Sequence, residues 1–318
     1  MSEIPVIDFS AFLDAGSAAA TKRSVALEID RACREVGFFY VSNHGIDPTL
    51  LQSMLDGART FFTTATQEQK DSIAIKKAGD GIGDLARGYQ RVDGGVKGAH
   101  EAVDMFRPVD TSNGPPYEVG LGENQWPDKP TDFQKVSEQY IDALLLLATA
   151  IVRAMAMALD VDETIFTSRI DKSFWNLRIL KYDATNADTV SPAVSGIGEH
   201  TGKQISSSPS WFGLLTRWDS LQVLSKTGAW IAADPIPGCF TVNLGDMLSK
   251  WTNGIYVSTR HRVIHNSTQP RISIPFFFDP NMDAHISPVL PLDGTDRENE
   301  GILYREMFKQ AITYSVVT

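Results

Sequence analysis

From Phe174 onward the chain is a series of short β-favouring runs separated by turns, and this feature limits its fold more than any other. The runs are rich in β-branched and aromatic residues, and Gly, Pro, Asn or Asp lie between them. Many short strands with such turns are typical of a β-sandwich or a barrel. The predicted strands are Leu177–Tyr182, Phe212–Thr216, Leu221–Leu224, Trp230–Ala232, Cys239–Leu244, His261–His265 and Ile272–Phe278.

The N-terminal half has a different pattern, in which apolar residues recur at helical spacing. The pattern predicts helices at Lys22–Val36, which Gly37 ends, at Pro48–Phe62 and at Phe133–Leu159. Short strands are expected at Ile4–Phe9 and Phe38–Val41, a long flexible loop at the glycine-rich residues 76–100, an irregular connection at 110–130 and a helix at Arg297–Ala311.

Composition excludes several classes of function. The longest apolar run, Ala143–Ala158, contains Thr149 and Arg153, so it predicts a buried helix rather than a membrane span. Two lone cysteines and an N-terminus without a basic stretch before an apolar one favour a cytoplasmic protein. The net charge is 29 − 39 = −10, which disfavours a nucleic-acid polymer as partner but leaves a small phosphorylated substrate open.

Two histidines carry the chemical signal. His200 ends a glycine-rich segment, and His261 follows 61 positions later inside a strand-like run. A lone histidine is most often structural, but two neutral imidazoles on barrel strands suit iron. Arg271 offers a planar guanidinium to the distal carboxylate of a keto diacid, Ser273 adds a hydroxyl group, and Tyr182 can donate its phenol.

These motifs resemble the isopenicillin N synthase-like branch of the iron(II)/2-oxoglutarate-dependent oxygenases. The resemblance covers nearly the whole chain, in segments that follow the family's order: residues 4–8, 37–45, 87–89, 177–182, 196–200, 237–238, 243–247, 251–254 and 271–278. It implies an α+β fold with a double-stranded β-helix (jelly roll) core and surrounding N-terminal and C-terminal helices. It also implies that His200 and His261 bind Fe(II), that Arg271, Ser273 and Tyr182 hold 2-oxoglutarate, and that O2 is the cosubstrate.

The resemblance divides the chain into four regions of one integrated domain. They are an N-terminal helical and β region (1–110), a connecting loop with a long spine helix (111–170), the jelly-roll core (171–282) and a C-terminal helical tail (283–318).

Gly202 departs from the family pattern, which has an aspartate ligand two residues after the first histidine. The segment that follows Gly202 also differs from the family's usual text. A glycine or alanine here resembles the family's radical halogenases. Losing the carboxylate opens a coordination position and removes a negative charge. Bound chloride would fill that position and restore the charge. The resemblance therefore implies a halogenase of antibiotic biosynthesis, which chlorinates an unactivated carbon of a freestanding small molecule through hydrogen abstraction and chlorine transfer.

Other interpretations of Gly202 remain open. The chain is alternatively a hydroxylase that carries an aspartate-to-glycine substitution, or a catalytically silent jelly-roll binding protein. Asp219 or Glu199 is a candidate replacement ligand, although strand alternation turns Glu199 away from His200. The segment Asn43-His44 is interpreted as a structural turn.

A likeness to a nucleotide halogenase suggests an adenine nucleotide as substrate. Basic residues of the 76–97 loop, with Lys203 and Arg217, are the candidates for holding its phosphate. Trp211 and Phe106 are the candidates for stacking on its base.

Overall fold

The protein is described from a computed structural model. It covers residues 4–75, 86–92, 100–108, 122–184, 196–201, 212–216, 221–265, 267–288, 290 and 301–317, with the backbone alone at 196–197, 212, 214–216 and 311–317. Of the sequence-predicted site residues, Gly202, Lys203, Trp211, Arg217 and Asp219 lie outside these ranges.

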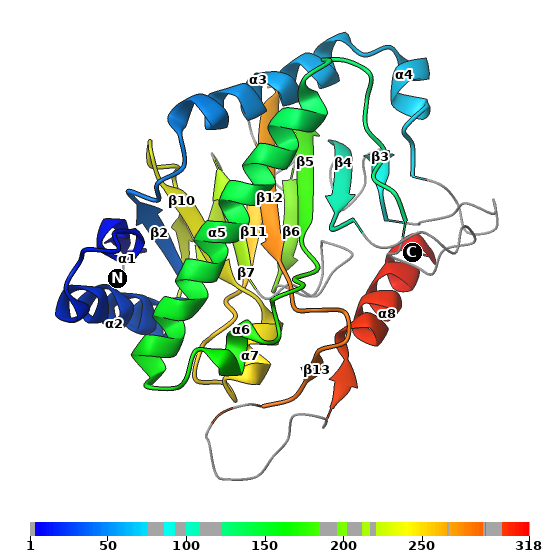
Figure 1. Ribbon diagram of the computed structural model, residues 1–318. Helices are drawn as coiled ribbons and strands as arrows, with labels where there is room; N and C mark the ends of the chain where they lie inside the picture. Colours follow the sequence, from blue (N-terminus) through cyan, green and yellow to red (C-terminus); the bar gives the residue numbers. More distant parts are fainter. Residues whose placement is uncertain are drawn as a thin grey trace.

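Two β-sheets form the centre of the molecule (Figure 1). The larger has the order β1-β2-β10-β7-β12-β5-β4-β3 and the smaller the order β6-β11-β8-β9. Facing sheets of this kind are the jelly-roll core of an α+β fold, which confirms the predicted fold class. The strands are β1 Val6–Asp8, β2 Phe38–Ser42, β3 Gly88–Val92, β4 His100–Phe106, β5 Asn176–Tyr182, β6 Gly196–His200, β7 Phe212–Thr216, β8 Leu221–Leu224, β9 Trp230–Ala232, β10 Phe240–Leu244, β11 His261–Ile264, β12 Arg271–Phe278, β13 His285–Ile286 and β14 Ile302–Leu303.

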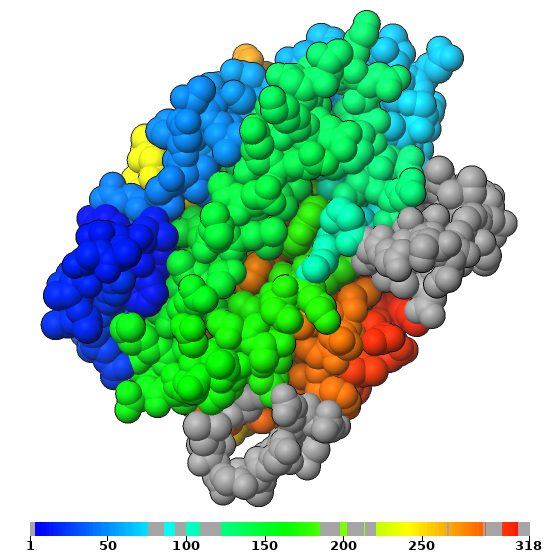
Figure 2. All heavy atoms as spheres, in the orientation of Figure 1, coloured from blue at the N-terminus to red at the C-terminus, as the bar shows by residue number. Residues whose placement is uncertain are grey.

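Three long helices cover the outer face of the larger sheet: α2 (Ala19–Glu35), α3 (Pro48–Thr64) and α5 (Phe133–Leu159). Their side chains form a continuous layer over that face in Figure 2. The other helices are α1 Ser10–Leu13, α4 Gln67–Asp71, α6 Thr164–Thr167, α7 Asp246–Trp251 and α8 Tyr304–Val317.

Local sequence explains where the helices next to β2 begin and end. Asp47 caps α3 by accepting a hydrogen bond of 2.8 Å from the Thr49 amide, and Pro48 has its fixed φ at the first helical position. Gly37, between α2 and β2, has a φ of +71°, and a Cβ there would lie 2.4 Å from the Val257 carbonyl oxygen. Only glycine fits this position without displacing the backbone.

The helix α5 satisfies the length and hydropathy criteria for a membrane span, with a mean hydropathy of 1.9 over its best window. Half of that window is buried, and α5 packs against α2, α3 and β12. This placement is that of a core helix, as its sequence predicts.

Two apolar clusters stabilise the layers. One lies between the helices and the larger sheet. The other, with Leu180, Tyr182, Val223 and Val263 among its members, lies between the two sheets. Side chains alternate between the two faces of a strand. Residues on the same face as the members of this second cluster therefore line the interior of the jelly roll. That interior is where the candidate site lies.

The predicted strands after Phe174 are confirmed to within about one residue. The prediction of a loop over residues 76–100 is wrong at its C-terminal side, where Gly88–Val92 is β3 and His100 begins β4. Every residue of β4 is buried, because helices cover one face and the jelly-roll interior the other. The acidic residues Glu101 and Asp104 interrupt its apolar pattern, and the sequence therefore did not indicate a strand.

Glu101 is the centre of a buried ionic cluster on the helix-covered face of the larger sheet. Its carboxylate accepts hydrogen bonds from Lys70 Nζ at 2.6 Å, Lys181 Nζ at 2.8 Å and the Tyr89 hydroxyl at 3.0 Å. Burial alone would raise the pKa of Glu101, but these donors outweigh it and hold the pKa below its usual value. The cluster joins α4 to β3, β4 and β5.

We predict that Glu101→Gln lowers the free energy of unfolding by about 3 kcal/mol at pH 7, because the buried Lys70 ammonium group loses its countercharge, whereas Lys181 keeps Asp183 at 2.8 Å. The unfolded chain takes up the Glu101 proton before the folded protein does, so this stabilisation fades as the pH falls below 4.5, the ordinary pKa. Urea unfolding followed by circular dichroism checks both effects. Glu163→Gln, at the exposed Arg153 pair, is the control and should change stability by less than about 0.5 kcal/mol. A deficit for Glu101→Gln that is unchanged at pH 3.5 would contradict the assignment.

Candidate active site

Antiparallel pairing of β6 and β11 brings the two histidines together. His200 is the last residue of β6, His261 is the first of β11, and the two are direct partners in the sheet. Their ring centroids lie 4.1 Å apart, and both side chains are buried. The pair predicted from motifs far apart in the sequence is therefore a single cluster in the fold.

Hydrogen bonds fix the orientation of both rings. His200 Nδ1 lies 2.8 Å from the Gly198 carbonyl oxygen, and His261 Nδ1 lies 3.0 Å from the Thr259 carbonyl oxygen. A carbonyl oxygen can only accept, so each Nδ1 must carry the proton and each Nε2 keeps its lone pair. Metal-binding histidines are commonly oriented by backbone carbonyl groups in this way.

Burial favours the neutral form of these imidazoles. It lowers the pKa of His200, and together with the neighbouring His200 it lowers the pKa of His261 to about 3. Neutral imidazole is the form that coordinates a metal, so the pair is ready to bind one without first releasing protons.

In the described part of the chain, no third His, Cys, Asp or Glu side chain joins this pair. Glu199 points away from it and forms an ion pair of 2.8 Å with Arg260 at the surface. The alternative of Glu199 as replacement ligand therefore fails. The two other candidates for the third position, Gly202 and Asp219, lie outside the described residues.

Asp246, at the start of α7, lies close to the end of β6. The hydroxyl of Thr201, the residue before Gly202, donates to Asp246 Oδ2 at 3.3 Å. The segment Asn243–Met247 belongs to the family resemblance, but no role was predicted for Asp246. The contact places a carboxylate next to the chain segment from which a third ligand would come.

A second group of polar side chains lies on the facing strands of the larger sheet. Arg271 is the register partner of Tyr182, and its guanidinium lies 5.0 Å from the centre of the Tyr182 ring. The Ser273 hydroxyl is fully buried and has no hydrogen-bond partner among the described residues. Burial raises the pKa of Tyr182, and the positive charge of Arg271 opposes this shift only in part. A guanidinium and two hydroxyl donors in one buried place are suited to bind a carboxylate.

Two further histidines lie against this group and were missed in the sequence. The rings of His100 and His265 lie 5.8 Å and 6.0 Å from that of Tyr182, and both side chains are buried. One signal was available, since His265 follows His261 by four residues and alternation along the predicted strand His261–His265 puts both on the same face. His100 gave none, because β4 itself was not predicted.

The predicted nucleotide contacts are not supported where the structure describes them. Phe106 is buried between Phe174 and Phe308, at ring distances of 5.4 Å and 5.8 Å, so its ring is not available to stack on a base. Arg87 is buried and donates to the Phe106 and Arg107 carbonyl oxygens, so it is a structural residue rather than a phosphate ligand. Arg91 pairs with Glu101 and Asp183.

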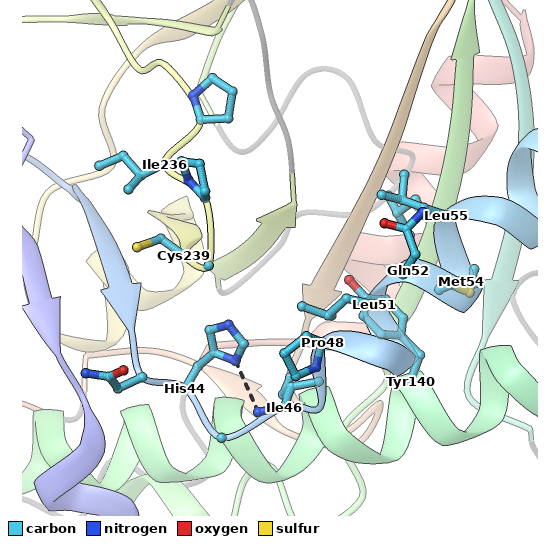
Figure 3. A pocket seen from close by; sticks show the side chains of 16 residues that line it. His44, Ile46, Pro48, Leu51, Gln52, Met54, Leu55, Tyr140, Ile236 and Cys239 are labelled. Carbon is cyan, nitrogen blue, oxygen red and sulfur yellow. Dashed lines mark hydrogen bonds between the residues drawn. The ribbon is translucent and has the colours of Figure 1, made fainter.

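A cavity of 850 Å³ lies apart from this site, where α3 meets the turn before β10 (Figure 3). Leu51 and Leu55 of α3 line one side, and Ile236 and Cys239 line the other. His44 lies between them, and its Nδ1 accepts a hydrogen bond of 3.1 Å from the Ile46 amide. This bond closes the turn after β2, consistent with the structural role predicted for Asn43-His44.

Comparisons with known proteins place the chain among oxygenases. The family model for the non-haem dioxygenase in morphine synthesis N-terminal region matches residues 4–129, and that of the 2OG-Fe(II) oxygenase superfamily matches residues 174–280. Homoarginine-6-hydroxylase 2-ODD-C23 of Glycine max is 34% identical over all of this chain and 97% of its own length. The 2-oxoglutarate-Fe(II) type oxidoreductase hxnY of Emericella nidulans is 31% identical over 90% and 82%, respectively.

Among solved structures, a full-length Neurospora crassa protein in complex with alpha-KG and thymine superposes with a TM-score of 0.82. It is 26% identical, and the match covers 98% of this chain and 97% of the Neurospora chain. These proteins support the use of iron and 2-oxoglutarate. The curated relatives are named hydroxylases and oxidoreductases, and they give no support to halogenation, chloride or antibiotic biosynthesis.

We predict that His261→Ala abolishes the charge-transfer absorption that Fe(II) and 2-oxoglutarate produce when added without oxygen, because one of two Nε2 ligands is lost. Arg271→Gln should retain metal binding but raise the Kd of 2-oxoglutarate at least tenfold, about 1.4 kcal/mol. The control is His285→Ala, since His285 is partly exposed and contacts Trp251 through its backbone carbonyl. Unchanged absorption in His261→Ala would remove this residue from the site.

Proposed function

This chain belongs to the 2OG-Fe(II) oxygenase superfamily, and from that premise we propose that it hydroxylates a C–H bond of a small, polar, nitrogen-containing metabolite. It is a non-haem iron, 2-oxoglutarate-dependent oxidoreductase. The observation that carries the proposal is the pairing of His200 with His261, two neutral imidazoles with both Nε2 atoms unprotonated. They lie in the same jelly roll as the Arg271, Ser273 and Tyr182 side chains. A catalytically silent protein would have no need of this arrangement.

Each group has a distinct task. His200 and His261 would hold the iron, and Arg271, Ser273 and Tyr182 would hold the distal carboxylate of 2-oxoglutarate. When bound, iron and 2-oxoglutarate supply the oxidising chemistry, in which O2 converts 2-oxoglutarate to succinate and CO2 and the C–H bond to C–OH. Leu180, Val223 and Val263 form apolar walls that keep water out of the interior.

The names of the relatives support the substrate class. The Glycine max relative is named for homoarginine, and the Neurospora crassa protein was solved with thymine. Both molecules are small and carry nitrogen groups that donate hydrogen bonds. The buried polar residues of the described interior are suited to such a ligand better than to an apolar one.

Halogenation is the second candidate, and Gly202 is the observation that favours it. A coordination position without a carboxylate has room for chloride, and the substrate would then receive chlorine instead of hydroxyl. The names of the relatives, a hydroxylase and an oxidoreductase, weigh against it. An adenine nucleotide as the substrate belongs to this second candidate.

Product analysis separates the two functions. The Fe(II)- and 2-oxoglutarate-loaded protein is given oxygen, chloride and a panel of L-homoarginine, L-arginine, thymine, uracil and adenosine monophosphate. We expect hydroxylated product from an amino acid or a pyrimidine, with one succinate for each product. A chlorine isotope pattern in the product would overturn hydroxylation in favour of halogenation.

We predict that Gly202→Asp increases the affinity for Fe(II) at least tenfold, about 1.4 kcal/mol, and increases hydroxylation, because it supplies the missing carboxylate ligand. Competition with a colorimetric chelator measures the affinity. Ala229→Asp is the control, since it adds the same charge at an exposed position of the turn between β8 and β9. If Gly202→Asp instead abolishes turnover while iron and 2-oxoglutarate still bind, the hydroxylase proposal is wrong and the vacant position is functional.

A further inference from the structure

A buried ion pair lies inside the jelly roll with no part in holding iron or 2-oxoglutarate. Asp104 of β4 is the register partner of Arg178 of β5. Two steps further along the same strands, Ala102 faces Leu180, and another two steps on, His100 faces Tyr182. Alternation therefore puts Asp104 and Arg178 on the interior face. The positive charge of Arg178 also acts on Tyr182, as expected for groups on one face.

Polar side chains surround the Asp104 carboxylate. Asn176 Nδ2 donates to Oδ1 at 3.3 Å and Gln90 Nε2 donates to Oδ2 at 3.1 Å. The nearest guanidinium nitrogen of Arg178 lies 3.5 Å from Oδ2. Burial raises the pKa of Asp104, with Arg178, Asn176 and Gln90 opposing the shift. The carboxylate is thus held in place by neutral amides, while its cationic partner stands slightly apart.

Stability does not account for this pair. A charge-assisted hydrogen bond is typically about 2.7–2.9 Å long, and replacing a buried ion pair by apolar residues is often neutral or stabilising. Strand register does not require it, because Glu101 and Lys181 pair at 2.8 Å on the other face of the same two strands. A buried pair of charges that the fold does not need is a candidate for ligand recognition.

We propose that Asp104 and Arg178 recognise the α-ammonium and α-carboxylate groups of an amino-acid substrate. The carboxylate of the ligand would pair with the guanidinium, and the ammonium with Asp104. The two charges of an α-amino acid are separated by a single carbon atom, which matches the short spacing between the two protein charges. A zwitterion has no net charge, so it satisfies a neutral protein pair without leaving an uncompensated charge in the interior.

A ligand bound at Asp104 and Arg178 would not occupy the residues that are proposed to hold 2-oxoglutarate. Arg178 precedes Tyr182 by four residues on one strand, a separation of about 13 Å. An amino acid at Asp104 and Arg178 therefore does not compete with 2-oxoglutarate for Arg271. This inference rests on the proposed hydroxylase function and names its substrate class.

Binding in the absence of oxygen tests the inference. Isothermal titration calorimetry is performed on protein loaded with Fe(II) and saturated with 2-oxoglutarate, so that Arg271 is occupied. The probes are the common L-amino acids and L-homoarginine, followed by the N-acetyl and methyl ester forms of the tightest binder. We expect each blocked form to bind at least tenfold more weakly. Failure of every amino acid to bind, or equal affinity for the blocked forms, would overturn the inference.

Variants assign each charge to its partner. Asp104→Asn should weaken the free amino acid at least tenfold and lose the preference over the N-acetyl form. Arg178→Gln should lose the preference over the methyl ester. Arg262→Gln is the control, because Arg262 lies on the outer face of β11, where it bonds Gln222 and covers Trp230. The double variant Asp104→Asn/Arg178→Gln leaves no unpaired charge, so it provides a folded protein if a single variant does not fold. Unchanged preferences in that protein would contradict the assignment.

Turnover separates this inference from the proposed function. Hydroxylation of a molecule that is not an amino acid, with no amino acid bound, would overturn the inference and leave the hydroxylase function standing. If the protein binds free amino acids more tightly than blocked ones but forms a chlorinated product when oxygen is admitted, the inference stands and the hydroxylase function is wrong.

Discussion

The antiparallel pairing of β6 with β11 is the constraint on which the site depends. The pairing of these strands sets His200 opposite His261, and the Gly198 and Thr259 carbonyl oxygens orient the two rings. In the larger sheet, the pairing of β12 with β5 likewise sets Arg271 opposite Tyr182. The chemistry is thus held by main-chain geometry, which tolerates wide variation in the side chains around it.

Much of the fold follows from the sequence because its signals are local. The helix Phe133–Leu159 and the strands after Phe174 were predicted nearly to their ends, since apolar spacing and turn residues mark them. The strand β4 was missed for a physical reason. It is covered on both faces, and its carboxylates Glu101 and Asp104 have partners that come from distant segments, which no local pattern reveals.

The site was predictable only where a motif names the chemistry. His200 lies beside His261 as expected, and Arg271 is the strand partner of Tyr182, whereas His100 and Asp104 became visible only through strand pairing. Gly202 shows the limit of such inference. A missing ligand indicates what the metal lacks, but it does not determine what takes its place. The oxygenase relatives shifted the balance from chlorination to hydroxylation.

The sheet order has a consequence for how the chain folds. Strand β2 lies near the N-terminus, but the antiparallel partner of its residue Phe38 is Asn243, about two hundred residues later. Strand β4 likewise pairs with β5, which lies about seventy residues further along the chain. Pairings this distant in sequence make folding slow and leave strand edges exposed meanwhile. During synthesis, the helices α2 and α3 can cover one face of the sheet, but one edge of β4 stays unpaired until β5 leaves the ribosome, and one edge of β2 until β10 does. The first half of the protein, made alone, would therefore present unpaired edges and aggregate.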